Sequence, residues 1–157
     1  MILGLVALLA NAGTVSLADG EAALWANPLD PSARLAYVRA LAAMPGREEE
    51  AMEGFLRLLT DPVEREDARA GLAGLLADRP PRPSWAALYT ALAGGPPGPG
   101  RDLGRLRLLQ LRAAAPETHA PAITTLRLFA TTHPNDAVAW MALGDALMAS
   151  GDASAAR

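Results

Sequence analysis

The two histidines, His119 and His133, are the first residues that could carry chemistry, because an imidazole can transfer protons or bind a metal ion near neutral pH. They lie 14 residues apart, which is not the short spacing typical of protein metal ligands. Both also fall near the predicted ends of helices. We therefore interpret the two histidines as turn or surface residues.

The acidic run Glu48-Glu49-Glu50 is the second candidate, since three neighbouring carboxylates could bind a metal ion or carry acid–base chemistry. The run follows the helix-breaking pair Pro45-Gly46 and precedes a stretch that is predicted to be helical. The dipole of a helix favours negative charge at its start. We therefore expect the three carboxylates to fill the first turn of a helix.

Other catalytic chemistries lack the residues that they need. The chain has no Cys and no Lys, which excludes a thiol nucleophile, a Schiff base and a thiolate metal site. The glycine-rich segment 94–101 lacks the Lys of a phosphate-binding loop, and none of the five Ser residues stands in a nucleophile motif. We expect no enzyme, no metal and no cofactor, and chemistry built from carboxylates alone is the alternative left open.

The composition indicates which elements must position these residues. Of the 157 residues, 51% are hydrophobic but only 4% are aromatic, so the core must consist mainly of Ala and Leu. These two residues favour helices, whereas β-branched and aromatic residues favour strands. No segment shows the strict alternation of a strand. We predict an all-α protein of about ten helices.

The expected helix boundaries are marked by capping residues, prolines and glycines. Ser16 with Asp19 resembles a capping box. Further expected starting residues are Asp30, Asp61, Ser84, Asp102 and the pair Asn135-Asp136. Together these signals predict helices at about residues 2–12, 17–26, 31–43, 48–59, 61–78, 84–93, 102–115, 120–132 and from 136 onward.

The short turns between these helices predict antiparallel hairpins. The segment "WMALGDAL" resembles the tetratricopeptide repeat, a helical hairpin of roughly 34 residues that carries the pattern W-x2-L-G-x2-Y. Trp140, Leu143 and Gly144 match the pattern, and Leu147 stands at the Tyr position. Leu106 lies 34 residues before Trp140 and opens a second match, although Gln110 replaces the Gly there. Residues 31–60 match more loosely.

The resemblance implies a right-handed superhelix of antiparallel hairpins, an α-solenoid whose first helices line a concave, protein-binding face. The hairpins are expected at about 1–27, 31–60, 61–93, 102–134 and 136–157 within a single domain. Gly144 is expected to let paired helices approach closely. The last hairpin is incomplete, so we expect either a piece of a longer protein or a partner that covers the open end.

The family's partner-binding positions can be carried onto this sequence. In the last hairpin and the one before it, they are Val138, Met141, Asp145, Met148, Arg107 and Leu111. Their mixed apolar and acidic character suggests a helical or extended peptide as the ligand. The resemblance thus implies a non-catalytic scaffold, or a subunit of a larger complex.

Residues 1–18 carry no charge and admit three interpretations: a short core helix, an uncleaved membrane anchor or the remnant of a signal peptide. An anchor would make the protein a membrane-associated subunit or assembly factor. Residues 27–59 are also similar to the helical repeats attached to some bacterial thioredoxin-like chaperones, so a chaperone-like module is a further alternative. The compartment stays open between the cytoplasm and the membrane or periplasm of a bacterium.

Charge is distributed unevenly along the chain. Residues 1–78 have a balance of −6, residues 79–135 a balance of +5, and residues 136–157 a balance of −2. Such a layout can steer a charged partner. The basic segment could contact phosphates, but the protein is acidic overall and poor in the aromatic residues that stack on bases. We expect a protein partner and no nucleic acid.

Overall fold

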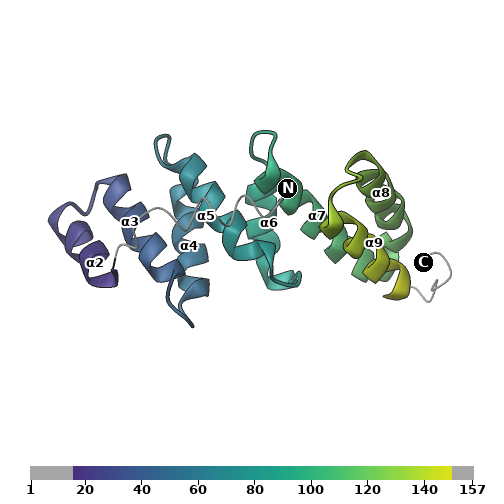
Figure 1. The fold of residues 1–157 in the computed structure, drawn as a ribbon, viewed down its shortest axis with the longest axis horizontal. Helices are drawn as coiled ribbons and strands as arrows, with labels where there is room; N and C mark the ends of the chain where they lie inside the picture. The colour runs from purple at the N-terminus through teal and green to yellow at the C-terminus, as the bar shows by residue number, and fades with distance from the viewer. Residues whose placement is uncertain (1–15, 150–157) are drawn as a thin grey trace. The chain divides into compact units, whose positions relative to one another are not determined.

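The computed structural model describes residues 16–149, and over this range the chain is all-helical without a strand. This part contains eight α-helices, labelled α2 to α9 (Figure 1). The all-α prediction is confirmed. The predicted helix at residues 2–12 and the second helix of the last hairpin lie outside the described residues, so the count of about ten helices stays a prediction.

The helices belong to two compact units that divide between Pro80 and Pro81. The first unit contains α2 (Leu17–Ala26), α3 (Pro31–Ala42), α4 (Glu48–Leu58) and α5 (Arg65–Ala77). The second contains α6 (Ala86–Ala93), α7 (Pro99–Ala114), α8 (His119–Thr132) and α9 (Ala137–Ala149), with short 3-10 turns at Pro83–Trp85 and Pro116–Thr118. The predicted hairpin 61–93 crosses this boundary. That hairpin and the single domain stay predictions.

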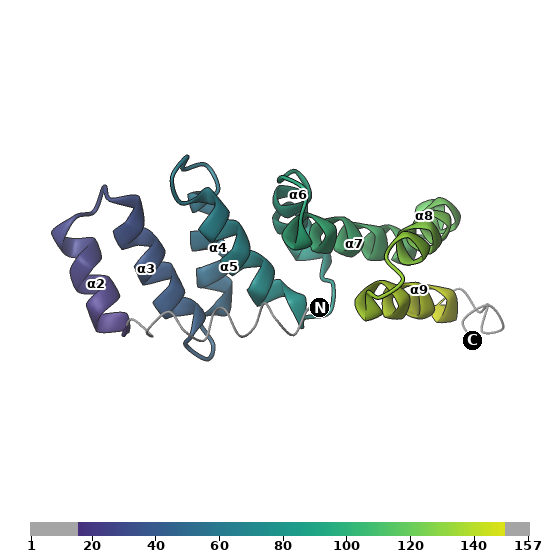
Figure 2. The same cartoon turned by 45° about the horizontal axis from the view of Figure 1, so that its top comes forward.

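Helices of the first unit pack on one another in chain order, as Figure 2 shows for α2 to α5. Helix α3 contacts α2, α4 and α5, and α4 contacts α5. The fully buried side chains are large and apolar, among them Leu41, Met52, Phe55, Leu72 and Leu76. Helices α3 and α4 correspond to the hairpin predicted at 31–60, and the two helices pack against each other.

Helix α7 is the centre of the second unit, because it contacts α6, α8 and α9. Leu106, Leu109, Leu126, Leu143 and Leu147 form its buried core together with alanines of α7, α8 and α9. The helices predicted as the hairpin 102–134, α7 and α8, also pack together. The first helix of the next hairpin, α9, contacts both of them.

Helices α6 and α7 come unusually close at Gly104. A methyl group on Gly104 would lie 2.6 Å from the backbone nitrogen of Ala93 and 2.7 Å from the carbonyl oxygen of Tyr89. Both atoms belong to the backbone of α6, so neither can move aside cheaply. The close approach expected at Gly144 involves the second helix of the last hairpin, which lies outside the described residues, so it stays a prediction; within the described range, a methyl group on Gly144 would meet no atom within 4 Å.

Several predicted helix starts are confirmed by hydrogen bonds. The carboxylate of Asp30 accepts from the amide of Ser32 at 3.0 Å, and the hydroxyl of Ser16 accepts from the amide of Asp19 at 3.2 Å. Asp136 accepts from the amide of Val138 at 3.0 Å. The turn before α4 uses Gly46 at φ 84°, a left-handed conformation that glycine adopts readily.

Three predicted starts are wrong by a few residues. Asp61 accepts from the amides of Val63 and Glu64, which makes a separate turn, and α5 begins only at Arg65. Helix α7 begins at Pro99 instead of Asp102, since proline suits the first turn of a helix. Ser84 caps no helix, because it lies inside the 3-10 turn before α6.

No helix among residues 16–149 is both long enough and apolar enough to cross a membrane. Residues 17 and 18 belong to α2. The rest of the candidate anchor at 1–18 lies almost entirely outside the described residues, so its three interpretations stay open.

Candidate functional site

Both histidines lie at the ends of α8 and bond to backbone carbonyl oxygens; His133 is exposed, as predicted, and His119 is half-buried. The Nδ1 atom of His133 lies 2.9 Å from the carbonyl oxygen of Phe129, in the last turn of α8. The Nδ1 atom of His119 forms the same kind of bond with the carbonyl oxygen of Ala113. A carbonyl oxygen only accepts, so each Nδ1 carries the proton in these bonds. The described residues contain no group of three His, Cys, Asp or Glu side chains placed to hold a metal ion.

Glu48, Glu49 and Glu50 fill the first turn of α4, as predicted. The backbone amide of Glu48 lowers the pKa of that residue's carboxyl. Arg79, with its Nη2 atom 3.5 Å from Oε1 of Glu48, lowers the pKa further. These contacts stabilise the first turn of α4, which is the structural role that we expected for the three glutamates.

The predicted partner-binding positions on α9 lie mostly on an exposed face. Met141 is 60% exposed and Met148 is 61% exposed, and Asp145 between them is exposed as well. Side chains four and seven residues apart share one side of a helix. The opposite side of α9 is buried against α7 and α8 through Leu143, Leu147 and three alanines. We call Met141, Asp145 and Met148 the α9 face.

The other three predicted positions are more enclosed. Val138 is partly buried against the core of the second unit, and Leu111 is half-buried. Arg107 is only 6% exposed, and its Nη1 atom donates to the side-chain oxygen of Gln110 at 3.0 Å. The helix turns Arg107 inward although the family pattern places this position on the concave face. Its burial does not support a direct contact with a partner.

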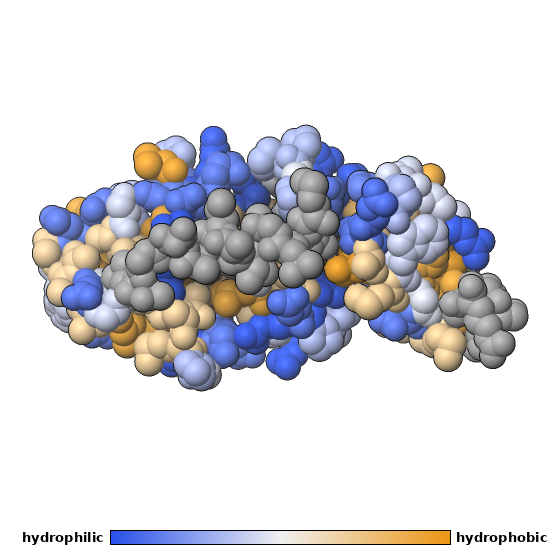
Figure 3. All heavy atoms as spheres, viewed as in Figure 1, coloured by the Kyte–Doolittle hydropathy of each residue, from blue (hydrophilic) through white to orange (hydrophobic). Residues whose placement is uncertain are grey.

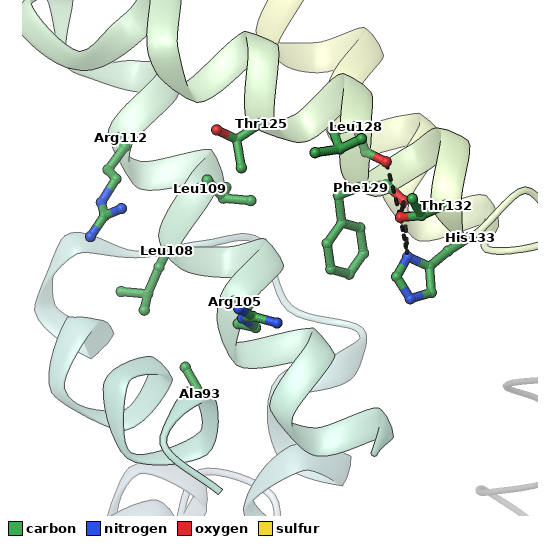
Figure 4. A pocket seen from close by; sticks show the side chains of 10 residues that line it. All are labelled: Ala93, Arg105, Leu108, Leu109, Arg112, Thr125, Leu128, Phe129, Thr132 and His133. Carbon is green, nitrogen blue, oxygen red and sulfur yellow. Dashed lines mark hydrogen bonds between the residues drawn. The ribbon is translucent and has the colours of Figure 1, made fainter. Parts of the chain in front are cut away.

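A groove opens where α7 lies beside α8 (Figure 4). It has a volume of about 520 Å³. The residues that matter for its chemistry are Arg105, Leu108 and Arg112 from α7, and Leu128, Phe129 and His133 from α8. We call this hollow the α7–α8 groove, and all of its lining belongs to the second unit.

The floor of the α7–α8 groove is apolar and its rim is basic. Figure 4 shows the side chains of Leu108, Leu128 and Phe129 around the hollow, with the two guanidinium groups beside them. Leu128 is 63% exposed, and the ring of Phe129 stacks on that of His133 with centroids 4.4 Å apart. Arg105 and Arg112 form no ion pair with any residue in the described range.

The α7–α8 groove was not predicted from the sequence, although the spacing of its two arginines is a partial signal. Arg105 and Arg112 are seven residues apart, so two turns of helix place them on one side together with Leu108. The α8 side carries no such signal, because leucine and phenylalanine in a helix are most often core residues. Only the packing of α8 on α7 shows that these two apolar side chains meet the two arginines.

Hydrophobic and hydrophilic residues alternate over α8 and α9 on the face drawn in Figure 3. Such a mixed surface does not by itself distinguish a binding site from the rest of a protein surface. Comparison of the chain with protein-family models, with curated proteins and with solved structures gives no match.

Proposed function

We propose that this chain is a non-catalytic helical-repeat protein, similar to tetratricopeptide repeats, that binds another protein through its second unit. The observation that carries the proposal is the α9 face, on which Met141 and Met148 are about three-fifths exposed while the other side of the helix is buried. Flexible methionine side chains adapt to the shape of a bound partner. The exposed carboxylate of Asp145 adds a polar contact that can fix orientation.

The packing of the second unit supports the repeat architecture. In stacked hairpins, the first helix of a hairpin packs on both helices of the hairpin before it. Helix α9 contacts both α7 and α8, as such stacking requires. The match between Leu106 and Trp140, 34 residues apart, supports equivalent positions for α7 and α9 in successive repeats. We infer a right-handed solenoid from this combination.

The proposal predicts one stoichiometric partner. Tagged full-length protein would be purified from soluble and membrane fractions separately, and the bound proteins would be identified by mass spectrometry. The double variant Met141→Ala/Asp145→Ala should lose the partner without a change in thermal unfolding, because both side chains are exposed.

The matched control is Val63→Ala/Glu117→Ala, which removes one exposed apolar side chain and one exposed carboxylate elsewhere. It should retain the partner. Retention by the α9 variant would exclude the α9 face, and absence of any partner from both fractions would contradict the proposed function.

A further inference from the structure

The arginines of the α7–α8 groove lie in a segment of the chain that is poor in carboxylates. Residues 79–135 contain seven arginines but only two acidic residues, so this segment has few carboxylates to neutralise its guanidinium groups. Arg105 and Arg112 stay without an ion pair inside the described range, and both are exposed at the rim of an apolar hollow. A groove with this lining matches a ligand that is apolar in the middle and negative at two points.

From this complementarity we propose that the α7–α8 groove binds an acidic amphipathic helix of a partner protein. The inference rests on the proposed function and specifies the chemistry of the bound segment. Apolar side chains of that helix pack on Leu108, Leu128 and Phe129, and two carboxylates pair with Arg105 and Arg112.

The spacing of the two arginines defines what the ligand must present. They are seven residues apart on α7, which corresponds to about 10 Å along the helix axis. Two glutamates separated by two turns of a bound helix span the same length. Leucines between them on the same face reach the apolar floor. The ligand therefore carries Glu, Leu and Glu along one stripe.

Binding would be measured by fluorescence anisotropy with the full-length protein and a fluorescein-labelled helical peptide that carries this Glu–Leu–Glu stripe. A second peptide has glutamine in place of both glutamates. We expect the glutamate peptide to bind at least about tenfold more tightly than the glutamine peptide, a difference that should shrink as salt is added.

The charge-reversal variant Arg105→Glu/Arg112→Glu should weaken binding of the glutamate peptide at least about tenfold, since two attractions become repulsions. Arg127→Glu is the matched control, because Arg127 is an exposed arginine of α8 outside the groove. It should change the affinity less than about twofold. A peptide with two lysines should bind the charge-reversal variant better than it binds the wild type. Thermal unfolding of each variant shows that the fold is kept.

Equal weakening by Arg127→Glu and by the charge reversal would overturn the inference, because it would mean a general attraction of anions. Equal affinity for the glutamate and glutamine peptides would overturn it as well. Suppose that a partner is captured through the α9 face but the glutamate peptide does not bind. This result would exclude the groove as the binding site of an acidic helix and would leave the proposed function in place. Binding of the glutamate peptide without any captured partner would support the groove as a peptide-binding site and would contradict the proposed function.

Discussion

Most arginines of the first unit pair with carboxylates of the same unit, whereas Arg105 and Arg112 of the second unit form no ion pair within the described range. Arg39 lies 2.8 Å from Asp67, Arg57 lies 2.7 Å from Glu53, and each pair joins exposed side chains. Arg105 and Arg112 have no such carboxylate in the described residues. The unpaired charges stand beside exposed apolar side chains.

The stability of the fold does not account for this difference. An exposed ion pair contributes about 0.2–1 kcal/mol, so the first unit gains little from its pairs. What the pairs change is the surface, because they satisfy charges that a partner could otherwise bind. The second unit keeps its positive charge available next to an apolar groove. Both units are built by helices that pack on one another, and we infer that their surfaces favour different ligands.

The largest expected effects come from the two cores. Phe55→Ala in the first unit should cost about 3–5 kcal/mol, and Leu126→Ala in the second about 2–5 kcal/mol, since both side chains are fully buried. Hydrogen exchange would locate the damage. We expect faster exchange in α3 to α5 for the first variant and in α7 to α9 for the second. Equal loss of protection throughout the chain in both variants would contradict the division into two units.

Two glycine substitutions test how closely the helices pack within the second unit. Gly104→Ala should destabilise it by about 1–3 kcal/mol, because the added methyl group meets backbone atoms of α6. Gly144→Ala is the matched control, because no atom of the described residues lies within 4 Å of the added methyl group, and the stability should rise by up to about 1 kcal/mol. Urea unfolding measures both. Wild-type stability of Gly104→Ala would show that α6 and α7 do not cross at this residue.

Substitutions of surface arginines should change the free energy of unfolding less than these core and glycine substitutions. A double-mutant cycle with Arg39→Ala and Asp67→Ala should yield a coupling of about 0.2–1 kcal/mol, as for other exposed pairs. Arg105→Ala and Arg112→Ala should change the free energy of unfolding by less than about 0.5 kcal/mol, because neither residue forms an ion pair within the described range. A loss above that value would mean that these arginines serve the fold of the second unit.

The smallest effect concerns Glu48, whose carboxyl pKa is lowered by its own backbone amide and by Arg79. A carboxyl with a depressed pKa stabilises the fold above its unfolded value of 4.5, and this contribution is lost as the pH falls through the folded value. NMR titration should place the pKa of Glu48 below 4.5 and show a rise toward it in Arg79→Ala. An unchanged pKa in that variant would exclude a contribution from Arg79.

Local signals in the sequence predict the helices well but not the surfaces between them. Asp30-Pro31 starts α3 as expected, because a cap and its hydrogen bond involve only neighbouring residues. Asp61 is followed by a turn instead, since its carboxylate binds two amides before the helix begins. Gly104 looked unremarkable, because its role depends on the backbone of another helix.

In the candidate site, too, local spacing could be predicted and packing could not. Met141, Asp145 and Met148 could be placed on one face from their spacing alone, and they are exposed. The burial of Arg107 and the meeting of Leu128 and Phe129 with Arg105 could not be predicted, because both depend on how α7 packs against its neighbours. Helical spacing determines which side chains share a face, while only packing determines which face stays open.

Photo-crosslinking in the full-length protein would show whether a partner binds through the second unit. A benzophenone amino acid would replace Leu128 in the groove, Met141 on the α9 face, or Val63 in the first unit, three exposed apolar positions. We predict that the captured partner crosslinks to positions 128 and 141 and not to position 63. Crosslinking at position 63 alone, or equally at all three positions, would contradict binding through the second unit.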